Sequence, residues 1–484
     1  MHIPIIQDAS TTTSVLLLHV PYPGKLKFHG MPSSLLHAVS VFAHRLAREG
    51  QLEQLGIFDP GTADASYRDK LASLLRAPDL RVLCLSSSSA ASEELAYAVD
   101  LARALRGDDL FILVGGPHED DCEQKVADRV PGVDLSIAGD AEEVLDFVLA
   151  TFLALAETPQ HFVAALPAEL AKHQLRGGRV TLTGASSGTT TLLLPSLTPR
   201  DLATPVWTNK RVAFSVFDTP ETLPIMVTRG CPYGRCSFCA EPNRESFLLR
   251  DEFEWIRDLA AMRPHAAIYL QDSILPAGAL VEGKLLPLLA SLGRPWGCQV
   301  YLRTLTQAFL QQLARAGCSY IYTGLETASP SILAEIGKTH LNTSLALERL
   351  RWARDLGVQV GVSLMFGAMA NDGRVLETAR TVDSTVLLAE SIVAADVPVA
   401  GFYPNIMTVL PGTQLARGLA RAGIAIDYYR MPRSEVFQDF EDGSVGYNFT
   451  TIPGLPGSAT AKGDLGRHIL DAATHIQNLG VHAW

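Results

Sequence analysis

The chain has 484 residues, 47% of them hydrophobic, and a formal net charge of −11, so we expect a globular protein of two or three domains. This acidic balance, without a Lys/Arg-rich stripe, excludes a dedicated binder of nucleic acid or anionic membranes. No apolar run approaches the roughly 18 residues of a membrane span, and the start lacks a signal-peptide pattern. We therefore expect a cytoplasmic protein whose substrate is a peptide or a small molecule.

Residues 1–155 alternate between apolar runs typical of buried strands and amphipathic segments typical of helices. Strand-like runs occupy residues 14–20, 81–89 and 110–118, and helix-like segments such as 92–107 lie between them. Strands that alternate with helices form parallel sheets covered on both faces. This region is therefore predicted to be a doubly wound, Rossmann-like α/β domain.

Residues 156–221 are less regular and carry only a weak strand pair, so we interpret them as a linker. From there on the alternation returns, with six strand-like runs separated mostly by helix-like segments. The last of the six runs is "NIMTVLPG" (405–412). Six βα units are fewer than the eight that close a TIM-type barrel. Residues 222–425 are therefore predicted to form a partial (βα)6 barrel, followed by a substrate-capping region at 426–484.

Three cysteines, Cys231, Cys236 and Cys239, lie within "CPYGRCSFC", just after the first barrel strand. A structural zinc site takes four ligands, and no second C-x2-C or His pair lies nearby. A thiol redox pair would use only the last two cysteines, and that motif belongs at the start of a helix in a thioredoxin-like fold. A cluster with four irons takes one thiolate per iron, so three cysteines leave one iron open. The cluster is the interpretation that uses all three thiols.

The motif, its place at the C-terminal mouth of the barrel, and Phe238 before the third cysteine resemble the radical S-adenosylmethionine (SAM) superfamily. The resemblance implies a [4Fe-4S] cluster on the three cysteines, with the amino and carboxylate groups of SAM on the open iron. It also implies an external electron donor of the flavodoxin or ferredoxin type and cleavage of SAM to a 5′-deoxyadenosyl radical. The first spacing, four residues instead of the usual three, departs from the family pattern.

Polar residues are expected at the C-terminal tips of the barrel strands, where barrel enzymes carry their active sites. By the same resemblance, these tips and the aromatic residue of the motif are predicted to bind SAM. The predicted SAM-binding residues are Phe238, Gln271, Asp272, Arg303, Glu326 and Ser363.

The first domain carries small and polar residues where its predicted strands end, in "PYPG", "SSSS", "GGPH" and "GDAEE". No G-x-G-x-x-G follows its first strand, so a nicotinamide or flavin site is disfavoured. The arrangement resembles the cobalamin-binding domain of one radical SAM branch. The candidates for contact with cobalamin are Pro21, Tyr22, Gly24, Ser86, Ser87, Ser88, Gly115, Gly116, Pro117, His118, Gly139 and Glu142. Because the segment Asp-x-His-x-x-Gly is missing, we expect no protein histidine below the cobalt.

The resemblance as a whole implies a cobalamin-dependent radical SAM C-methyltransferase. One SAM would methylate the cobalt, and a second would yield the radical that activates an unreactive carbon of a peptide or small natural product; that carbon would take the methyl group from methylcobalamin. Three alternatives stay open: a rearrangement or cyclisation, a non-radical methylation of an sp2 carbon, and a non-catalytic cobalamin or cluster sensor. A methylthiotransferase would need three more cysteines in the first domain, where only Cys84 and Cys122 occur.

Overall fold

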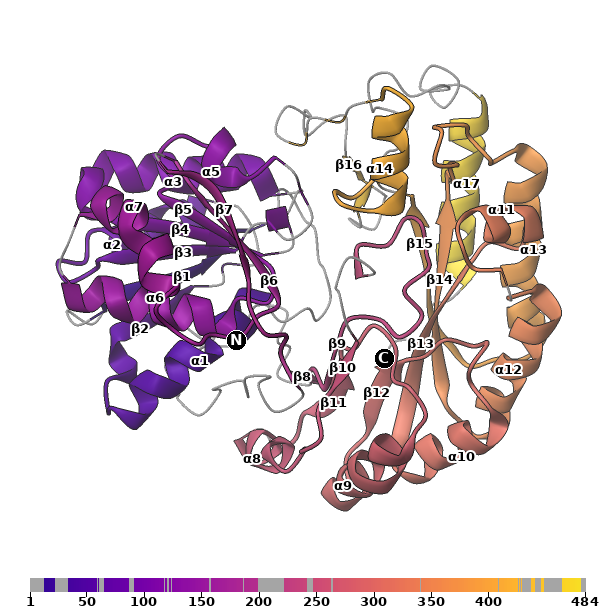
Figure 1. The fold of residues 1–484 in the computed structure, drawn as a ribbon. Coiled ribbons are helices and arrows are strands. Elements are labelled where there is room, and N and C mark those ends of the chain that lie inside the picture. The colour runs from indigo at the N-terminus through magenta and orange to yellow at the C-terminus, as the bar shows by residue number, and fades with distance from the viewer. Residues whose placement is uncertain are drawn as a thin grey trace. The chain divides into compact units, whose positions relative to one another are not determined.

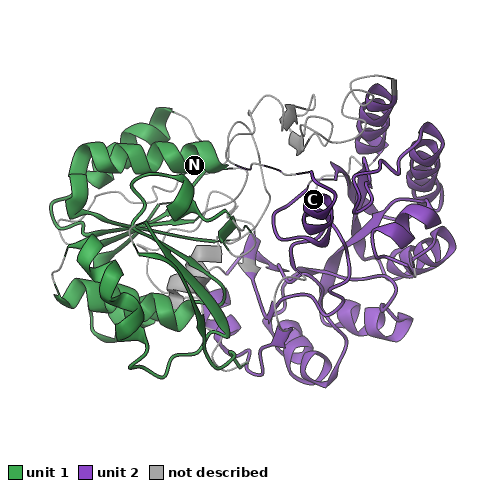
Figure 2. Cartoon of the chain, turned by 45° about the horizontal axis from the view of Figure 1, so that its top comes forward, with its two compact units in different colours: residues 1–219 green, residues 220–484 purple. Residues whose placement is uncertain are grey.

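The computed structural model describes residues 13–21, 34–58, 60, 65–86, 91–116, 118–119, 122, 124–155, 158–185, 187–198, 222–241, 247–262, 264–339, 341–407, 409–424, 426, 428, 437–439, 445–447 and 464–479. The chain divides into two compact units, Met1–Thr219 and Pro220–Trp484, each built on its own sheet (Figure 2). Within the described residues, no helix is both long enough and apolar enough to cross a membrane.

The first unit contains five parallel strands in the order β2-β1-β3-β4-β5 (Figure 1). They are β1 (Val15–His19), β2 (Leu55–Phe58), β3 (Val82–Ser86), β4 (Phe111–Gly115) and β5 (Leu135–Ala138). Nearly every residue of these strands is buried, as expected for a parallel sheet with helices on both faces. The predicted doubly wound domain is therefore confirmed.

The helices of this part pack in two pairs, α1 beside α6 and α2 beside α3. The helical segments are α1 (Ser34–Arg48), η1 (Leu52–Gln54), α2 (Ala65–Leu75), α3 (Ser92–Arg106), η3 (Gly107–Asp109), α5 (Val126–Arg129) and α6 (Glu142–Leu155). They follow the strands in alternation, as the sequence pattern predicts.

Residues 158–198 complete the first unit, so the prediction of a linker at 156–221 is wrong over them. The helix α7 (Pro159–Leu170) places the ring of Phe162 5.7 Å from the ring of Phe111 in the sheet. Strands β6 (Arg179–Gly184) and β7 (Gly188–Leu193) extend the sheet in antiparallel fashion beyond β5. Because β7 is a threonine-rich, largely exposed edge strand, it lacks the apolar run that marks a buried strand. The remainder of the predicted linker, from 199 on, lies outside the described residues.

The second unit is a half-barrel of six parallel strands that stand side by side in chain order (Figure 1). The strands are β8 (Thr222–Ile225), β11 (Ala267–Leu270), β12 (Trp296–Gln299), β13 (Cys318–Glu326), β14 (Gln359–Phe366) and β15 (Val399–Ile406). Among the described residues β8 and β15 do not pair with each other, so the sheet stays open. The predicted partial barrel is confirmed.

Helices connect the strands of the half-barrel, and one more, α14, follows the last strand. They are α8 (Trp255–Met262), the π-helical turn η5 (Val281–Leu285) that continues into α9 (Leu286–Leu292), α10 (Gln307–Arg315), α11 (Pro330–Glu335), α12 (Thr343–Asp355), α13 (Ala379–Ala394) and α14 (Gln414–Arg421). Ser329 caps the start of α11 by accepting a hydrogen bond from the Ile332 N–H, and Pro330 occupies the first helical position.

The sixth strand lies earlier in the chain than predicted. It spans Val399–Ile406, whereas the sequence analysis expects it at 405–412. Pro404 lies within it, and a proline removes a ladder N–H group, so this segment does not resemble a strand. The proline is tolerated because β15 is an edge strand that pairs only with β14. The opposite edge strand, β8, carries Pro224.

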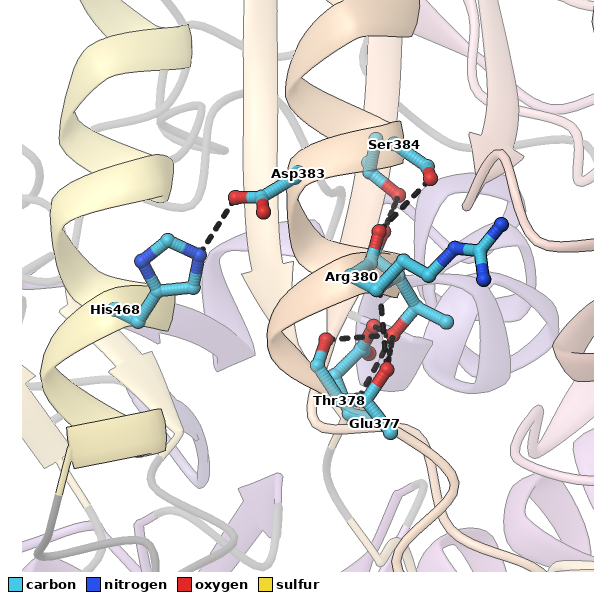
Figure 3. Close-up of polar contacts among 8 residues, drawn as sticks. Glu377, Thr378, Arg380, Asp383, Ser384 and His468 are labelled. Atoms are coloured by element: carbon cyan, nitrogen blue, oxygen red, sulfur yellow. Dashed lines mark hydrogen bonds and ion pairs between the residues drawn. The ribbon is translucent and has the colours of Figure 1, made fainter.

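The C-terminal helix α17 (Asp464–Leu479) packs against α13 and β15 and thus belongs to the second unit. Figure 3 shows His468 reaching from α17 to Asp383 on α13, with 2.7 Å between Nε2 and Oδ1. Seven residues further along both helices, which is about two turns, His475 Nε2 lies 3.0 Å from Glu390 Oε1. A short hairpin of β16 (Phe437–Asp439) and β17 (Val445–Tyr447) also contacts β15. A substrate-capping role for 426–484 stays a prediction.

Candidate functional site

The three cysteines lie in a tight loop shortly after the first half-barrel strand. The short strand β9 (Thr228–Arg229) pairs with β10 (Leu248–Leu249) and forms the neck of this cysteine loop, residues 230–241. Gly230 (φ +78°) and Gly234 (φ +57°) adopt the left-handed conformation that glycine tolerates without a steric penalty. These two turns let the backbone double back, so that all three thiols belong to one compact loop.

The cysteine loop rests on the segment that follows helix α11. The Ser237 N–H donates to the Ile336 carbonyl (3.0 Å), and the Tyr233 hydroxyl donates to the Gly337 carbonyl. Gly337 has φ +82°, and a Cβ atom there would lie 2.2 Å from the Arg235 carbonyl oxygen. Real Cβ contacts are not this short, so only glycine allows the two backbones to approach so closely.

The thiols of Cys236 and Cys239 are costly to ionise in this setting. Burial raises the pKa of Cys236 to about 11 and that of Cys239 to about 12, and the neighbouring thiols of the loop add to both shifts. A metal centre that binds them as thiolates would offset this cost. A four-iron cluster takes one thiolate per iron, and the three thiols of the loop suit that requirement.

A buried ion pair, which the sequence analysis did not find, lies beside the cysteine loop. Lys338 Nζ lies 2.6 Å from Glu326 Oε1 and donates to the Gly324 carbonyl (3.0 Å). Both side chains are about nine-tenths buried, with exposed fractions of 11% and 9%. Burial alone would lower the pKa of Lys338, but Glu326 and the thiols of Cys236 and Cys239 raise it. The Lys338 ammonium is therefore a fixed positive charge next to the thiols.

Glu326, predicted to contact SAM, is the last residue of β13. It adopts φ +64°, and the register between β13 and β14 shifts between Gly324 and Glu326. A non-glycine residue in this region costs about 1–3 kcal/mol, and such residues cluster at functional sites. The strain supports the predicted role of Glu326. Its partner Lys338 comes after helix α11 in the sequence, and no periodic pattern predicts that the two side chains meet. The local sequence signal for Lys338 is the Gly-Lys pair after α11.

Asp272, also predicted to contact SAM, supports the strand that leads into the cysteine loop. Its Oδ1 accepts hydrogen bonds from the Val227 N–H (2.9 Å), the Thr228 N–H and the Thr228 hydroxyl (2.7 Å). Burial raises its pKa to about 6 in spite of these bonds. Next to it, the Gln271 N–H donates to the Ile225 carbonyl (2.8 Å). Contact of Asp272 and Gln271 with SAM stays a prediction.

The remaining predicted SAM residues are spread over the loop and the strands. Phe238 is half-buried within the cysteine loop, and Arg303 is exposed in the loop after β12. Ser363 lies within β14, where its hydroxyl accepts a hydrogen bond from Asn405 Nδ2 (3.0 Å). Because Ser363 pairs in register with Gly324, it belongs to the same part of the sheet as Glu326.

Tyrosines line one face of the half-barrel sheet, opposite the fully buried aliphatic residues of the same strands. This tyrosine face consists of Tyr269, Tyr320, Tyr322 and Tyr403, with Gly297, Gly361 and Gly401 between the rings. A Cβ at Gly361 would lie 2.0 Å from the Tyr320 hydroxyl, so the glycine makes room for that ring. Burial raises the pKa of Tyr322 to about 12, which keeps this phenol neutral. No local pattern in the sequence predicts this face.

The predicted cobalamin residues that the structure describes lie at or just after the carboxyl ends of strands of the first unit. Those that the structure describes are Pro21, Ser86, Gly115, Gly116, His118, Gly139 and Glu142; Tyr22, Gly24, Ser87, Ser88 and Pro117 lie outside the described residues. Gly116 (φ +113°) and Gly139 (φ +95°) both need glycine. A Cβ at Gly139 would also lie 2.3 Å from the Arg179 carbonyl oxygen. Small residues at this edge fit a broad, flat ligand.

His118 is buried, with 1% of its surface exposed, and is not an open crevice residue. Burial, with a contribution from the charge of Lys125, lowers the pKa of His118 to about 4, so the imidazole is neutral at physiological pH. The adjacent Glu119 is also buried and its carboxylate accepts the Val126 N–H (2.8 Å). The contact of His118 with cobalamin stays a prediction.

The half-barrel with a three-thiol loop after its first strand defines the class of this unit. Residues 225–382 match the model of the radical SAM superfamily, so this part of the chain is a radical SAM domain. The recognition made from the cysteine motif is thereby confirmed.

Solved structures with the same overall fold extend over almost the whole chain. The radical SAM methyltransferase TsrM from Kitasatospora setae, with its tryptophan substrate and a SAM analogue bound, has a TM-score of 0.65 at 17% identity, covering 95% of this chain and 88% of that one. The cobalamin-dependent SAM radical enzyme OxsB with aqua-cobalamin bound has a TM-score of 0.58 at 14% identity, covering 93% and 67%. The chain therefore has the fold of cobalamin-dependent radical SAM enzymes.

Two curated proteins show detectable sequence similarity. Bacteriochlorophyllide d C-8(2)-methyltransferase of Chlorobaculum tepidum is 24% identical over 245 residues, which is 47% of this chain and 51% of that protein. An uncharacterized methyltransferase of Pyrococcus horikoshii is 22% identical over 369 residues, covering 74% and 73%. The match thus spans about half the length of the first relative and nearly three quarters of the second.

Proposed function

We propose that this chain is a cobalamin-dependent radical SAM methyltransferase that adds a methyl group to a carbon atom of a peptide or small natural product. The observation that carries the proposal is the half-buried cysteine loop that follows the first strand of the half-barrel and lies beside a buried charged pair. Solved structures with this fold hold a SAM analogue, a [4Fe-4S] cluster and cobalamin, and three of the similar proteins are methyltransferases by name.

In this proposal the chain's residues divide into three groups. Cys231, Cys236 and Cys239 hold the cluster. SAM lies against Phe238, Gln271, Asp272, Arg303, Glu326 and Ser363. Asp272 also holds the strand from which the cysteine loop departs. When bound, the cluster supplies the electron that cleaves SAM, and cobalamin carries the methyl group. The protein contributes placement of these groups and exclusion of water.

The small residues at the carboxyl edge of the first sheet hold cobalamin. Ser86, Gly115, Gly116 and Gly139 leave space for a flat macrocycle, and the neutral, buried His118 lies beside them. No histidine of the protein is assigned to the lower face of the cobalt. The electrons come from an external flavodoxin- or ferredoxin-type donor, and the reducing cytoplasm is the compartment that suits such a cluster.

A second candidate function, non-radical methylation of an sp2 carbon, is favoured by the tyrosine face. Its uncharged rings and glycines suit a flat aromatic substrate, because aromatic rings stack or meet edge to face at little cost. The centroids of Tyr322 and Tyr403 lie 5.4 Å apart and those of Tyr269 and Tyr320 6.1 Å apart, so the face is a packed aromatic surface. A rearrangement or cyclisation has no comparable support in these residues.

The test is turnover by anaerobically reconstituted full-length protein with SAM, a low-potential reductant and L-tryptophan as an aromatic probe. Release of 5′-deoxyadenosine supports radical chemistry, whereas a methylated product without it supports the sp2 candidate. The variant in which all three loop cysteines are alanine should do neither. If wild-type protein with a full cluster consumes no SAM, the proposal fails and a non-catalytic sensor becomes the better account.

A further inference from the structure

We propose that Lys338 is a positioning residue whose fixed positive charge sets the reduction potential of the metal cluster on the cysteine loop, with Glu326 acting in the opposite direction. The inference rests on the proposed function in one respect, that the loop holds an iron–sulfur cluster.

The position of Lys338 is fixed by the same segment that supports the cysteine loop. Residues 336–338 follow α11. The Ile336 carbonyl accepts a hydrogen bond (3.0 Å) from the N–H of Ser237, a residue that lies between the second and third cysteines. A Cβ at Gly337 would lie only 3.5 Å from the Cα atom of Cys236. Lys338, the next residue, is therefore attached to a backbone in direct contact with the loop.

The ammonium group has little freedom to move away. It is held by Glu326 Oε1 at 2.6 Å and by the Gly324 carbonyl at 3.0 Å, and the ring of Tyr301 lies 5.7 Å from Nζ. A Cβ at Gly324 would lie 2.9 Å from Nζ and 2.3 Å from Glu326 Oε1. The absence of a side chain at Gly324 thus makes room for the ion pair, and the strained backbone of Glu326 directs its carboxylate toward Lys338.

The charges that face this group predict its effect. Glu326 contributes one negative charge and the thiols of Cys236 and Cys239 lie within electrostatic reach of Lys338. Charges interact strongly where water is excluded, and cluster potentials respond to nearby charge and hydrogen bonds. Reduction adds an electron to the cluster. A neighbouring cation therefore raises the potential and a neighbouring anion lowers it.

A merely structural role for the pair makes a different prediction. Removing one partner of a buried ion pair leaves the other uncompensated, which destabilises the protein whichever partner is removed. Replacing Lys338 and replacing Glu326 would then both lower the stability, and the two effects would have the same sign. Opposite shifts of potential in two variants that both retain the cluster can only come from charge.

The experiment is a spectroscopic redox titration, with dithionite as reductant, of full-length protein reconstituted with iron and sulfide. K338M should lower the midpoint potential, E326Q should raise it, and K338R should leave it near that of wild type. The double variant K338M/E326Q should return toward the wild-type value. K284M, which alters an exposed lysine of the π-helical turn, is the matched control and should not move it.

Three outcomes are decisive. Opposite shifts for K338M and E326Q support the proposal; if K338M does not retain its cluster, an upward shift in E326Q with an unshifted K338R supports it in the same way. Equal potentials in all variants that retain a full cluster, or shifts of the same sign, overturn it. If the wild-type protein itself holds no cluster, the proposed function fails. This result is distinct from failure of the Lys338 proposal, because it is seen in wild type before any variant is compared.

Discussion

The two sheets of this chain bury their faces differently. In the first unit β1, β3, β4 and β5 are buried nearly end to end and consist mainly of aliphatic residues. In the half-barrel, β11 and β13 mix buried and half-buried residues; Tyr269 and Tyr322 are half-buried, and Tyr320 is buried. A sheet covered on both faces can bind a ligand only at its strand ends. The half-barrel also carries the tyrosine face, which the second candidate function assigns to a flat aromatic substrate.

The difference also explains where glycines are required. In the first unit Gly139 allows one backbone to approach another at a strand end, and in the second unit Gly337 does the same beside the cysteine loop. Gly361, by contrast, lies within a strand and makes room for a side chain. Substitutions at these three positions therefore distinguish the contribution of the strand ends from that of the tyrosine face.

The largest effect is expected for Gly337→Ala. The new Cβ would lie 2.2 Å from the Arg235 carbonyl oxygen, so about 1–3 kcal/mol of overpacking adds to roughly 1 kcal/mol from the left-handed backbone. We expect a lower stability in urea titrations and a reduced iron content after reconstitution.

Gly139→Ala and Gly357→Ala are the controls for that variant. Gly139→Ala creates a similar clash, 2.3 Å from the Arg179 carbonyl oxygen, and should lower stability and cobalamin binding while leaving the iron content unchanged. Gly357→Ala shares the positive φ but meets no atom within 4 Å, so it should cost only the backbone strain. Normal iron content in Gly337→Ala would contradict the assigned support of the loop.

The next effect concerns the pH dependence that Asp272 imposes on stability. Burial raises its pKa from 3.8 to about 6 in the folded protein. The folded state then binds this proton more tightly than the unfolded state. The contribution of this proton to the free energy of unfolding is complete below pH 3.8 and is lost as the pH rises to about 6. The shift of about 2.2 pH units corresponds to a loss of about 3 kcal/mol, at 1.36 kcal/mol per unit.

Asp272→Asn removes the titration and keeps the oxygen that accepts the Val227 and Thr228 hydrogen bonds. The difference in unfolding free energy between wild type and variant should therefore fall between pH 4 and 6, as measured by urea titrations at each pH. Asp258→Asn, at an exposed site on α8, is the control and should show no such trend. A difference that stays constant across this range would refute the buried state assigned to Asp272.

A smaller effect is expected for Gly361→Ala on the tyrosine face. Its Cβ would lie 2.0 Å from the Tyr320 hydroxyl oxygen, and overpacking of this kind costs about 1–3 kcal/mol. Removing that hydroxyl in Tyr320→Phe should relieve part of the clash, so a double-mutant cycle should give a favourable coupling energy. Gly283→Ala, with open space around the new Cβ, should be close to neutral. Strict additivity in the cycle would count against the packed tyrosine face.

The smallest effect is expected for His468→Ala on the C-terminal helix. Its partner Asp383 is 60% exposed, and exposed pairs contribute about 0.2–1 kcal/mol. The variant should therefore lower the midpoint of thermal unfolding only slightly, with His475→Ala as its matched neighbour. A loss of more than about 2 kcal/mol would show that this helix depends on the pair far more than exposed ion pairs allow.

The sequence predicts those features that local patterns encode. Alternation of apolar runs is enough for both sheets, and the three cysteines are close together because they are close in sequence. Contacts between distant segments carry no such signal: Lys338 meets Glu326 across a helix, and Tyr320 fits over Gly361 only after two strands pair. Two edge strands, β7 and β15, are also hard to predict from the sequence, because β7 is polar and β15 contains Pro404. Neither segment has the usual apolar strand pattern, and each becomes a strand by pairing with its neighbour.

The central claim, that one chain holds both a cluster and cobalamin, is tested most directly by the visible absorption spectrum of full-length protein purified and reconstituted without oxygen. Wild-type protein should show a broad iron–sulfur band together with cobalamin bands. The variant with alanine at Cys231, Cys236 and Cys239 should keep only the cobalamin bands. A wild-type spectrum with a cluster and no cobalamin after incubation with cobalamin, or with neither group, would contradict the account.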